Sequence, residues 1–225
     1  MDIRWFGQSA FLLAGTKRVL IDPFGALGES AAARGFRFDY PPIEPVEVDL
    51  LLITHEHVDH HADETIGGSP EILRSTAGRL GSPIGEVLAV ASEHDRAAGT
   101  ERGPNTIFRF GLDGLRVCHL GDFGQPALRP EQQQAIGEVD LLFVPVGGGP
   151  TVGGEAAAAI VRALGARLVV PMHYRTEAVN FLDPPDDFLE ALGYPVERPG
   201  DSAAVVEPLL ADGGRRVLLL APPGA

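Results

Sequence analysis

Short apolar runs separated by glycine-containing turns make up the start of the chain. Three such runs, at 3–6, 10–14 and 18–22, are separated by Gly7 with Gln8 and by Gly15 with Thr16. This spacing is typical of neighbouring strands joined by tight turns. The next apolar run, at 49–54, is nearly continuous, as expected of a strand covered on both faces. The first quarter of the chain therefore predicts a β-meander and then a buried strand.

Further along the chain, apolar runs alternate with segments that have helix start and stop signals. We expect strands at 85–92, 105–110, 115–120, 140–146, 167–172, 203–208 and 216–221. Helices are predicted at 130–137, 155–165 and 183–193. Each begins at or beside a proline or an acidic residue and stops at a glycine, which is the usual asymmetry of helix ends. An α/β arrangement of two sheets between outer helices satisfies this order, with residues 1–225 as one domain.

The segment 23–48 is rich in Gly, Ala and Pro and is too long for an ordinary connection. Long loops in compact domains are often lids or binding loops. Phe24, Phe36, Phe38 and Tyr40 give this segment more apolar anchors than a disordered surface excursion needs. We therefore expect a lid or binding loop here, with a surface excursion as the alternative.

Composition and charge narrow the class of protein. The chain has 225 residues, 44% of them hydrophobic and 22% charged, which is typical of a globular protein. No apolar run approaches the roughly 20 residues that span a bilayer, and the start lacks a signal peptide, so we expect a cytoplasmic protein without a membrane partner. A net charge of −13 argues against nucleic acid as a partner. The single cysteine, Cys118, leaves histidine and carboxylate as the metal ligands available.

The stretch HEHVDHH, residues 55–61, holds four of the seven histidines directly after the run at 49–54. His55 and His57 are two apart, so in extended backbone their side chains leave the same face. Asp59 and His60 follow where the chain turns toward a helix start expected at 62–66, and can face a second cation. Nitrogen and oxygen donors together suit zinc or another first-row divalent ion and do not suit a calcium loop. We interpret this stretch as a metal site rather than a solvated polar loop.

The remaining histidines, His94, His119 and His173, all stand at ends of predicted strands and can supply further ligands. Asp122 follows Gly121 at a turn, where a carboxylate can project over a sheet edge. Two cations held close together need an anionic ligand between them. Asp122 is the best placed candidate for that position.

The order of HEHVDH, His94, Gly121 with Asp122, and His173 resembles the metal-binding pattern of the metallo-β-lactamase superfamily of binuclear hydrolases. The segments IRWFGQSAFLL, VLIDPF, RGPNTIFRF, HLGDFG, FVPVGGG and VVPMHY resemble the branch that includes ascorbate-phosphate lactonase-like proteins and cytoplasmic metal-dependent hydrolases. The resemblance covers nearly the whole chain. It implies a four-layer αββα sandwich of two mixed sheets, with the metals at one edge of the sheets.

The resemblance also implies roles for single residues. His55, His57 and His94 would hold the first metal, Asp59, His60 and His173 the second, and Asp122 would bridge them. The two divalent ions would be zinc, or else manganese or iron. Asp22 matches an acidic residue that supports the ligands, with a turn aspartate as the alternative reading. Asp59 could also orient the attacking water or accept its proton, so Asp59 and Asp122 are the candidate catalytic carboxylates.

Several residues near the motif ends have less certain roles. His119 could be a ligand, a supporting or substrate-binding group, or a structural residue, and His61 falls outside the pattern. The other residues that could reach a substrate or support the site are Gln8, Asn105, Gln125, Tyr174 and Arg175, with a surface or hydrogen-bonding role as the alternative for each. A guanidinium at Arg175 would favour an anionic phosphate or carboxylate substrate.

The expected activity is hydrolysis of a small-molecule ester, lactone or phosphoester by a metal-bound hydroxide. A phosphodiesterase or nuclease is the alternative among hydrolases, and the net charge disfavours it. Outside hydrolysis, the alternatives are an iron-dependent oxidoreductase and a non-catalytic metal-binding protein. His57 argues against the di-iron type, whose members carry glutamate at that position. A homo-oligomer is common enough among soluble proteins to be expected as well.

Overall fold

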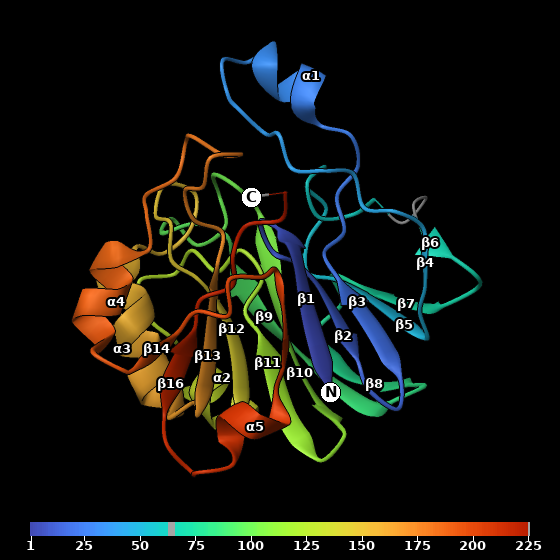
Figure 1. Ribbon diagram of the computed structural model, residues 1–225, viewed down its shortest axis with the longest axis vertical. Helices are drawn as coiled ribbons and strands as arrows, with labels where there is room; N and C mark the ends of the chain where they lie inside the picture. Colours follow the sequence, from blue (N-terminus) through green and yellow to red (C-terminus); the bar gives the residue numbers. More distant parts are fainter. Residues whose placement is uncertain (63–65, 225) are drawn as a thin grey trace.

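Two mixed β-sheets lie face to face in the computed structural model, which describes residues 1–62 and 66–224 (Figure 1). The strands of the first sheet are β1 (Asp2–Gly7), β2 (Ala10–Ala14), β3 (Arg18–Ile21), β5 (Leu50–Ile53), β7 (Glu71–Arg74) and β15 (Ala203–Val205). They are ordered β15-β1-β2-β3-β5-β7. The pairs from β15 to β3 are antiparallel, and β3, β5 and β7 are parallel. The predicted meander and the buried strand after it are therefore confirmed.

The first sheet is covered on both faces. Leu13, Val19 and Leu52 belong to the main core between the two sheets. Their neighbours Leu20 and Leu51 point to the opposite face and form a smaller cluster there. Val46 and Ile66 pack on that cluster from a short parallel pair, β4 (Val46–Glu47) and β6 (Ile66–Gly67). Apolar residues at consecutive positions of β5 are thus all buried, as its sequence predicts.

The second sheet has eight strands and its helices lie on its outer face (Figure 1). Its strands are β8 (Gly78–Ser82), β9 (Gly85–Glu93), β10 (Pro104–Leu112), β11 (Leu115–His119), β12 (Leu141–Pro145), β13 (Leu168–Met172), β14 (Val196–Glu197) and β16 (Arg216–Leu218). Strands β8 to β11 are antiparallel, and β11, β12, β13, β16 and β14 are parallel. The helices are α2 (Pro130–Ile136), α3 (Gly154–Leu164) and α4 (Asp186–Leu192). The two mixed sheets with outer helices confirm the predicted α/β sandwich.

Helix boundaries follow the predicted signals with one shift. Gly137 and Gly165 end α2 and α3 in backbone conformations with positive φ, which glycine adopts without a steric penalty. Helix α4 begins at Asp186 rather than at residue 183. Asp183 and Pro184 each precede a proline, and that position disfavours helical backbone.

Two predicted elements are wrong in part. Of the helix start expected at 62–66, Ala62 is not helical and Ile66 pairs with Val46 in β6, and residues 63–65 lie outside the described part. The strand expected at 203–208 ends at Val205. A short helix, α5 (Glu207–Leu210), follows it, and Pro208 in its first turn could not donate to a sheet. Pattern reasoning also missed α1 (Gly28–Ala32) and the short strands β4, β7, β8 and β14.

Segment 23–48 rises above one edge of the two sheets and carries α1 at its tip (Figure 1). Its base is anchored by Phe24, Phe38 and Tyr40, which pack with Val179 and Leu182 in a separate apolar cluster. Helix α1 itself has no buried residue. In the described part of the chain, none of the helices has the length and hydrophobicity to cross a membrane.

Candidate metal centre

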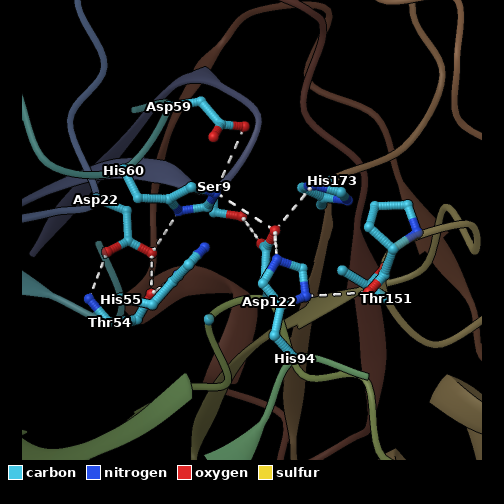
Figure 2. A network of polar contacts seen from close by, with 12 residues as sticks. Ser9, Asp22, Thr54, His55, Asp59, His60, His94, Asp122, Thr151 and His173 are labelled. Atoms are coloured by element: carbon cyan, nitrogen blue, oxygen red, sulfur yellow. Dashed lines mark hydrogen bonds and ion pairs between the residues drawn. The ribbon is translucent and has the colours of Figure 1, made fainter. Parts of the chain in front are cut away.

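The candidate ligands gather at the edge of the sandwich where the parallel strands end. Asp22 follows β3, His55 follows β5, His94 follows β9, Asp122 follows β11 and His173 follows β13. Strands of one direction bring their carboxyl ends to the same edge, so residues up to 151 positions apart in the chain meet there. Figure 2 shows these side chains converging from both sheets.

Seven side chains form two triads and a shared carboxylate. His55, His57 and His94 place one ligand atom each within 4.8 Å of one another, and so do Asp59, His60 and His173. Asp122 Oδ2 lies 3.2 Å from His94 Nε2 in the first triad. The same oxygen lies 3.4 Å from His60 Nε2 and 3.2 Å from His173 Nε2 in the second. One carboxylate oxygen therefore touches both triads (Figure 2).

Hydrogen bonds around Asp22 set the ring orientation of two histidines. Asp22 accepts hydrogen bonds from Thr54 N (2.8 Å) and Thr54 Oγ1 (2.7 Å). Since Thr54 gives its hydroxyl proton to Asp22, it accepts from His55 Nδ1 at 3.0 Å. His60 Nδ1 donates to Asp22 at 3.0 Å. In both histidines Nδ1 is the donor to these groups, so Nε2 is the nitrogen that can face a cation.

His94 is oriented in the same way by a backbone oxygen. Its Nδ1 lies 3.0 Å from the Pro150 carbonyl, which can only accept, so the ring donates there and Nε2 is the nitrogen that faces Asp122. Both oxygens of Asp22 are engaged by Thr54 and His60, as expected of a carboxylate that orients metal ligands. A third close group, Asp22 with His55 and His60, is explained by these bonds.

The charges and free nitrogens of the cluster favour binding of a cation. Burial lowers the pKa of His55, so its ring is neutral. Burial also lowers the pKa of His60, but the carboxylates of Asp122, Asp59 and Asp22 outweigh this effect and hold that pKa well above its ordinary value. Within the described residues, His55 Nε2, His60 Nε2 and His173 Nδ1 are buried without a hydrogen-bond partner. Free histidine nitrogens beside clustered carboxylates are the donor set of a divalent metal, so the residues fit the predicted ions.

Asp122 is held in place by two groups from distant parts of the chain, Ser9 and Asn105, and its turn is supported by the nearby His119. Ser9 Oγ donates to Asp122 Oδ1 at 3.0 Å. Asn105 Oδ1 accepts from Asp122 N at 3.0 Å. His119 Nε2 donates to Ser9 O, and its Nδ1 accepts from Gly121 N, both at 3.1 Å. Both ring nitrogens of His119 are therefore engaged in the turn that carries Asp122, which leaves neither nitrogen for a cation.

Gly121 is required by this arrangement. Its φ is +58°, and a Cβ there would lie 2.3 Å from Asn105 Oδ1 and 2.8 Å from Thr54 Cβ. The turn can therefore pass between Thr54 and Asn105 only without a side chain. Sequence reasoning missed Ser9 as a support, because a contact between residues 113 positions apart leaves no local signal.

The structure does not bring the other candidates to the ligands. Tyr174 is buried against Trp5, with ring centroids 5.3 Å apart, and Arg175 Nε donates to Leu182 O at 2.6 Å. Both line a separate hollow with Arg198. Gln8 is buried, and only its backbone oxygen, which accepts from His173 N at 3.2 Å, links it to a ligand.

His61 also stays outside both triads, with Nδ1 3.9 Å from the Glu56 carboxylate.

A pocket of about 560 Å³ opens over the cluster. His57, Asp59, His94, Asp122 and His173 line its floor. Its other walls come from Arg34, Phe36, Glu56, Val58, Arg102, Gly149, Pro150 and Phe181. Segment 23–48 thus contributes two side chains to the pocket. Sequence reasoning did not single out Arg34, Arg102 or Phe181, since isolated residues in loops are usually exposed surface groups.

Comparisons with known proteins agree with this geometry. The family model described as "Beta-lactamase superfamily domain" matches residues 2–173. A protein of Thermococcus kodakarensis named a UPF0173 metal-dependent hydrolase is 31% identical, covering 86% of this chain and 92% of its own. A UPF0173 protein of Pyrococcus furiosus is 33% identical over 78% of this chain and 84% of its own. A Thermotoga maritima structure, described as a zinc-dependent hydrolase of the metallo-β-lactamase superfamily, superposes with a TM-score of 0.77, 31% identity and 97% coverage of both chains.

Proposed function

Because the chain belongs to the β-lactamase superfamily, we propose that it is a metal-dependent hydrolase that uses two divalent cations on a small-molecule ester, lactone or phosphoester. The superfamily predicted from the sequence is confirmed. Assignment to the branch with lactonase-like proteins stays a prediction.

The observation that carries the proposal is the position of Asp122. A site for one cation needs one triad, whereas here two triads of ligands face the same carboxylate oxygen. His55, His57 and His94 would hold one ion, and Asp59, His60 and His173 the other. A bridging carboxylate of this kind offsets the repulsion between two close cations. Burial raises the pKa of Asp122, but His173 and His60 outweigh it and hold that pKa well below its ordinary value, so the group is anionic.

When bound, two divalent cations would lower the pKa of a water and polarise the carbonyl or phosphoryl oxygen under attack. The protein's own groups supply orientation. Asp59 is partly exposed and lines the pocket, so its carboxylate can hold a water by a hydrogen bond and take its proton. Ser9, Asn105 and His119 fix Asp122, which keeps the two triads in register. No nucleophile from the protein is needed, and Cys118 is unsuited because burial raises its pKa to about 12.

The proposal is tested with a substrate panel of lactones, thioesters, phosphodiesters and β-lactams. Each is assayed with the protein as purified, after chelation, and after addition of zinc, manganese or iron(II). We expect turnover of at least one ester, lactone or phosphoester that chelation abolishes and metal restores. Turnover that chelation leaves unchanged would overturn the proposal.

A further inference from the structure

Two arginine side chains at the pocket over the metal centre have no ion pair among the described residues. Arg34 comes from segment 23–48 and Arg102 from the turn between β9 and β10, and both are exposed. The nearby carboxylate of Glu56 is already engaged by Arg74 Nη2 at 2.7 Å and by Ser75 Oγ at 3.0 Å. The positive charges of Arg34 and Arg102 are therefore free to meet an anion. In a chain with a net charge of −13, they stand out at this position.

Arg102 is carried by a well-built turn rather than a loose loop. The carboxylate of Asp95 accepts backbone hydrogen bonds from Ala97 (2.7 Å), Gly99 (2.8 Å), Glu101 (3.1 Å) and Arg102 itself (2.8 Å). Asp95 directly follows the ligand His94, so the same turn positions a ligand and a cationic side chain. The placement of Arg102 at the pocket is thus a fixed property of the fold.

The pocket also has an apolar wall open to solvent. Phe36 is 45% exposed and Val58 60% exposed, and they are two of the four large hydrophobic side chains exposed in the described part. Phe181 packs edge-on against Phe36, with centroids 5.2 Å apart. A smaller hollow of about 120 Å³ continues beneath α1 and is lined by Leu27 and Phe38 together with Phe36. Exposed apolar surface gathered in a pocket is typical of a ligand site.

We propose that the substrate is a small amphipathic anion, whose carboxylate or phosphate is bound by Arg34 and Arg102 and whose apolar body lies against Phe36, Val58 and Phe181. This inference rests on the proposed function and names its substrate class. Guanidinium groups pair with planar or tetrahedral oxyanions through two N–H donors, and such charged hydrogen bonds are stronger than neutral ones. The pocket of about 560 Å³ can enclose a small molecule but is too small to enclose a polymer.

The test compares two esters of the same leaving group, 4-nitrophenyl benzoate and 4-nitrophenyl 4-carboxybenzoate, whose rigid para carboxylate cannot attack its own ester. They differ in a free carboxylate. Wild type, Arg34→Gln, Arg102→Gln and the double variant are assayed with metal-loaded protein. Arg198→Gln is the matched control, because Arg198 is also exposed but lines the separate hollow.

We expect wild type to prefer the carboxylated ester by at least about tenfold in kcat/KM, the size of one charged hydrogen bond. Each pocket variant should lose most of that preference through KM, while kcat/KM for the benzoate ester, which has no carboxylate to bind, changes less than about twofold. Arg198→Gln should behave as wild type. Equal use of both esters by wild type, or an undiminished preference in the double variant, would overturn the inference.

Calorimetry with benzoate, phenyl phosphate and benzamide separates this inference from the proposed function. Both anions should bind wild type at least about tenfold more tightly than the double variant, and benzamide should not discriminate. Comparison of the two anions distinguishes a carboxylate from a phosphate site. If no ester is hydrolysed but this pattern holds, the hydrolase proposal fails and the anion site stands. Equal anion affinities in wild type and the double variant would contradict the anion site whatever the activity.

Discussion

Two buried carboxylates, Asp122 and Asp140, lie at opposite ends of the neighbouring parallel strands β11 and β12. Asp140 precedes β12 and is paired with Arg116, whose Nε lies 2.8 Å and Nη2 2.9 Å from its oxygens; Arg167 adds a contact at 3.5 Å. Asp122 follows β11 and meets only histidines and hydrogen-bond donors. One carboxylate is balanced by cations of the protein itself. No arginine or lysine pairs with the other in the described part.

The difference indicates that one end of these strands carries a carboxylate that stabilises the fold and the other end carries a carboxylate suited to binding metal. The charge of Asp140 is already balanced by arginine, so no bound cation is needed to neutralise it. The Arg116 guanidinium lowers the pKa of Asp140 to about 2. A carboxylate among histidines with free nitrogens is complete only when cations are added. Changes at Asp122 should therefore affect metal binding and activity, and changes at Asp140 should affect folding alone.

The largest effect is expected from Asp122→Asn. Loss of the bridging charge removes several kcal/mol of stabilisation from the metals and the reacting oxygen, so kcat/KM should fall at least about a thousandfold. Steady-state kinetics on the best substrate of the panel measures this. The change is nearly isosteric, so circular dichroism should show the wild-type fold. A loss of less than tenfold would mean that Asp122 does not join the two triads.

A smaller effect is expected from Asp22→Asn, which disturbs the support of His55 and His60. Outer carboxylates of this kind are typically worth about 10- to 100-fold in metal affinity. Competition with a chromogenic zinc chelator measures the affinity. Asp2→Asn, an exposed position at the start of β1, is the control and should bind zinc as wild type does. Unchanged zinc affinity in Asp22→Asn would mean that Asp22 only shapes the turn before Pro23 and does not support the histidines.

His119→Asn tests whether His119 is a support or a ligand. As a support, it should leave two zinc ions bound per chain and weaken their affinity by up to about tenfold. His61→Asn is the matched histidine control, and we expect no change in it. Elemental analysis after dialysis decides the question, since loss of a whole zinc equivalent in His119→Asn would make it a ligand.

Asp140→Asn should lower the free energy of unfolding by about 1–2 kcal/mol and leave zinc content and kcat/KM as in wild type. The pKa of Asp140 is depressed in the folded state. Its contribution is therefore fully present above pH of about 4 and is lost as the pH falls toward 2. Urea unfolding at several pH values measures it, and the gap between wild type and variant should narrow below about pH 4. A gap independent of pH would contradict this origin.

Much of the candidate metal site could be predicted from the sequence because its proposed ligands follow apolar strands in motifs with fixed spacing. Local patterns place His55, His57 and Asp59 at a strand end, and the superfamily resemblance assigns partners to them. Ser9 as a support, and Arg34 and Arg102 in the pocket, depend on how the chain folds back on itself, and no local pattern encodes that. Arg175 shows the same limit. It lies close to His173 in the sequence, but its side chain donates a hydrogen bond to Leu182 O instead of reaching the site.

The fold was predictable to a similar degree. Long apolar strands and helices bounded by proline and glycine were placed correctly, since each depends on its own residues. The short strand β6 was missed because it depends on the pairing of Ile66 with Val46. These two residues are separated in the sequence by the stretch that holds His55, His57, Asp59 and His60. Partly exposed strands such as β7 and β8 have too few buried residues to give a clear pattern.

The most direct test of the central claim is the number of zinc ions bound per chain, measured by elemental analysis after equilibrium dialysis for wild type and Asp122→Asn. If Asp122 joins two triads, wild type binds two ions and the variant retains at most one. A single ion in wild type, or two ions of unchanged affinity in the variant, would contradict the binuclear site.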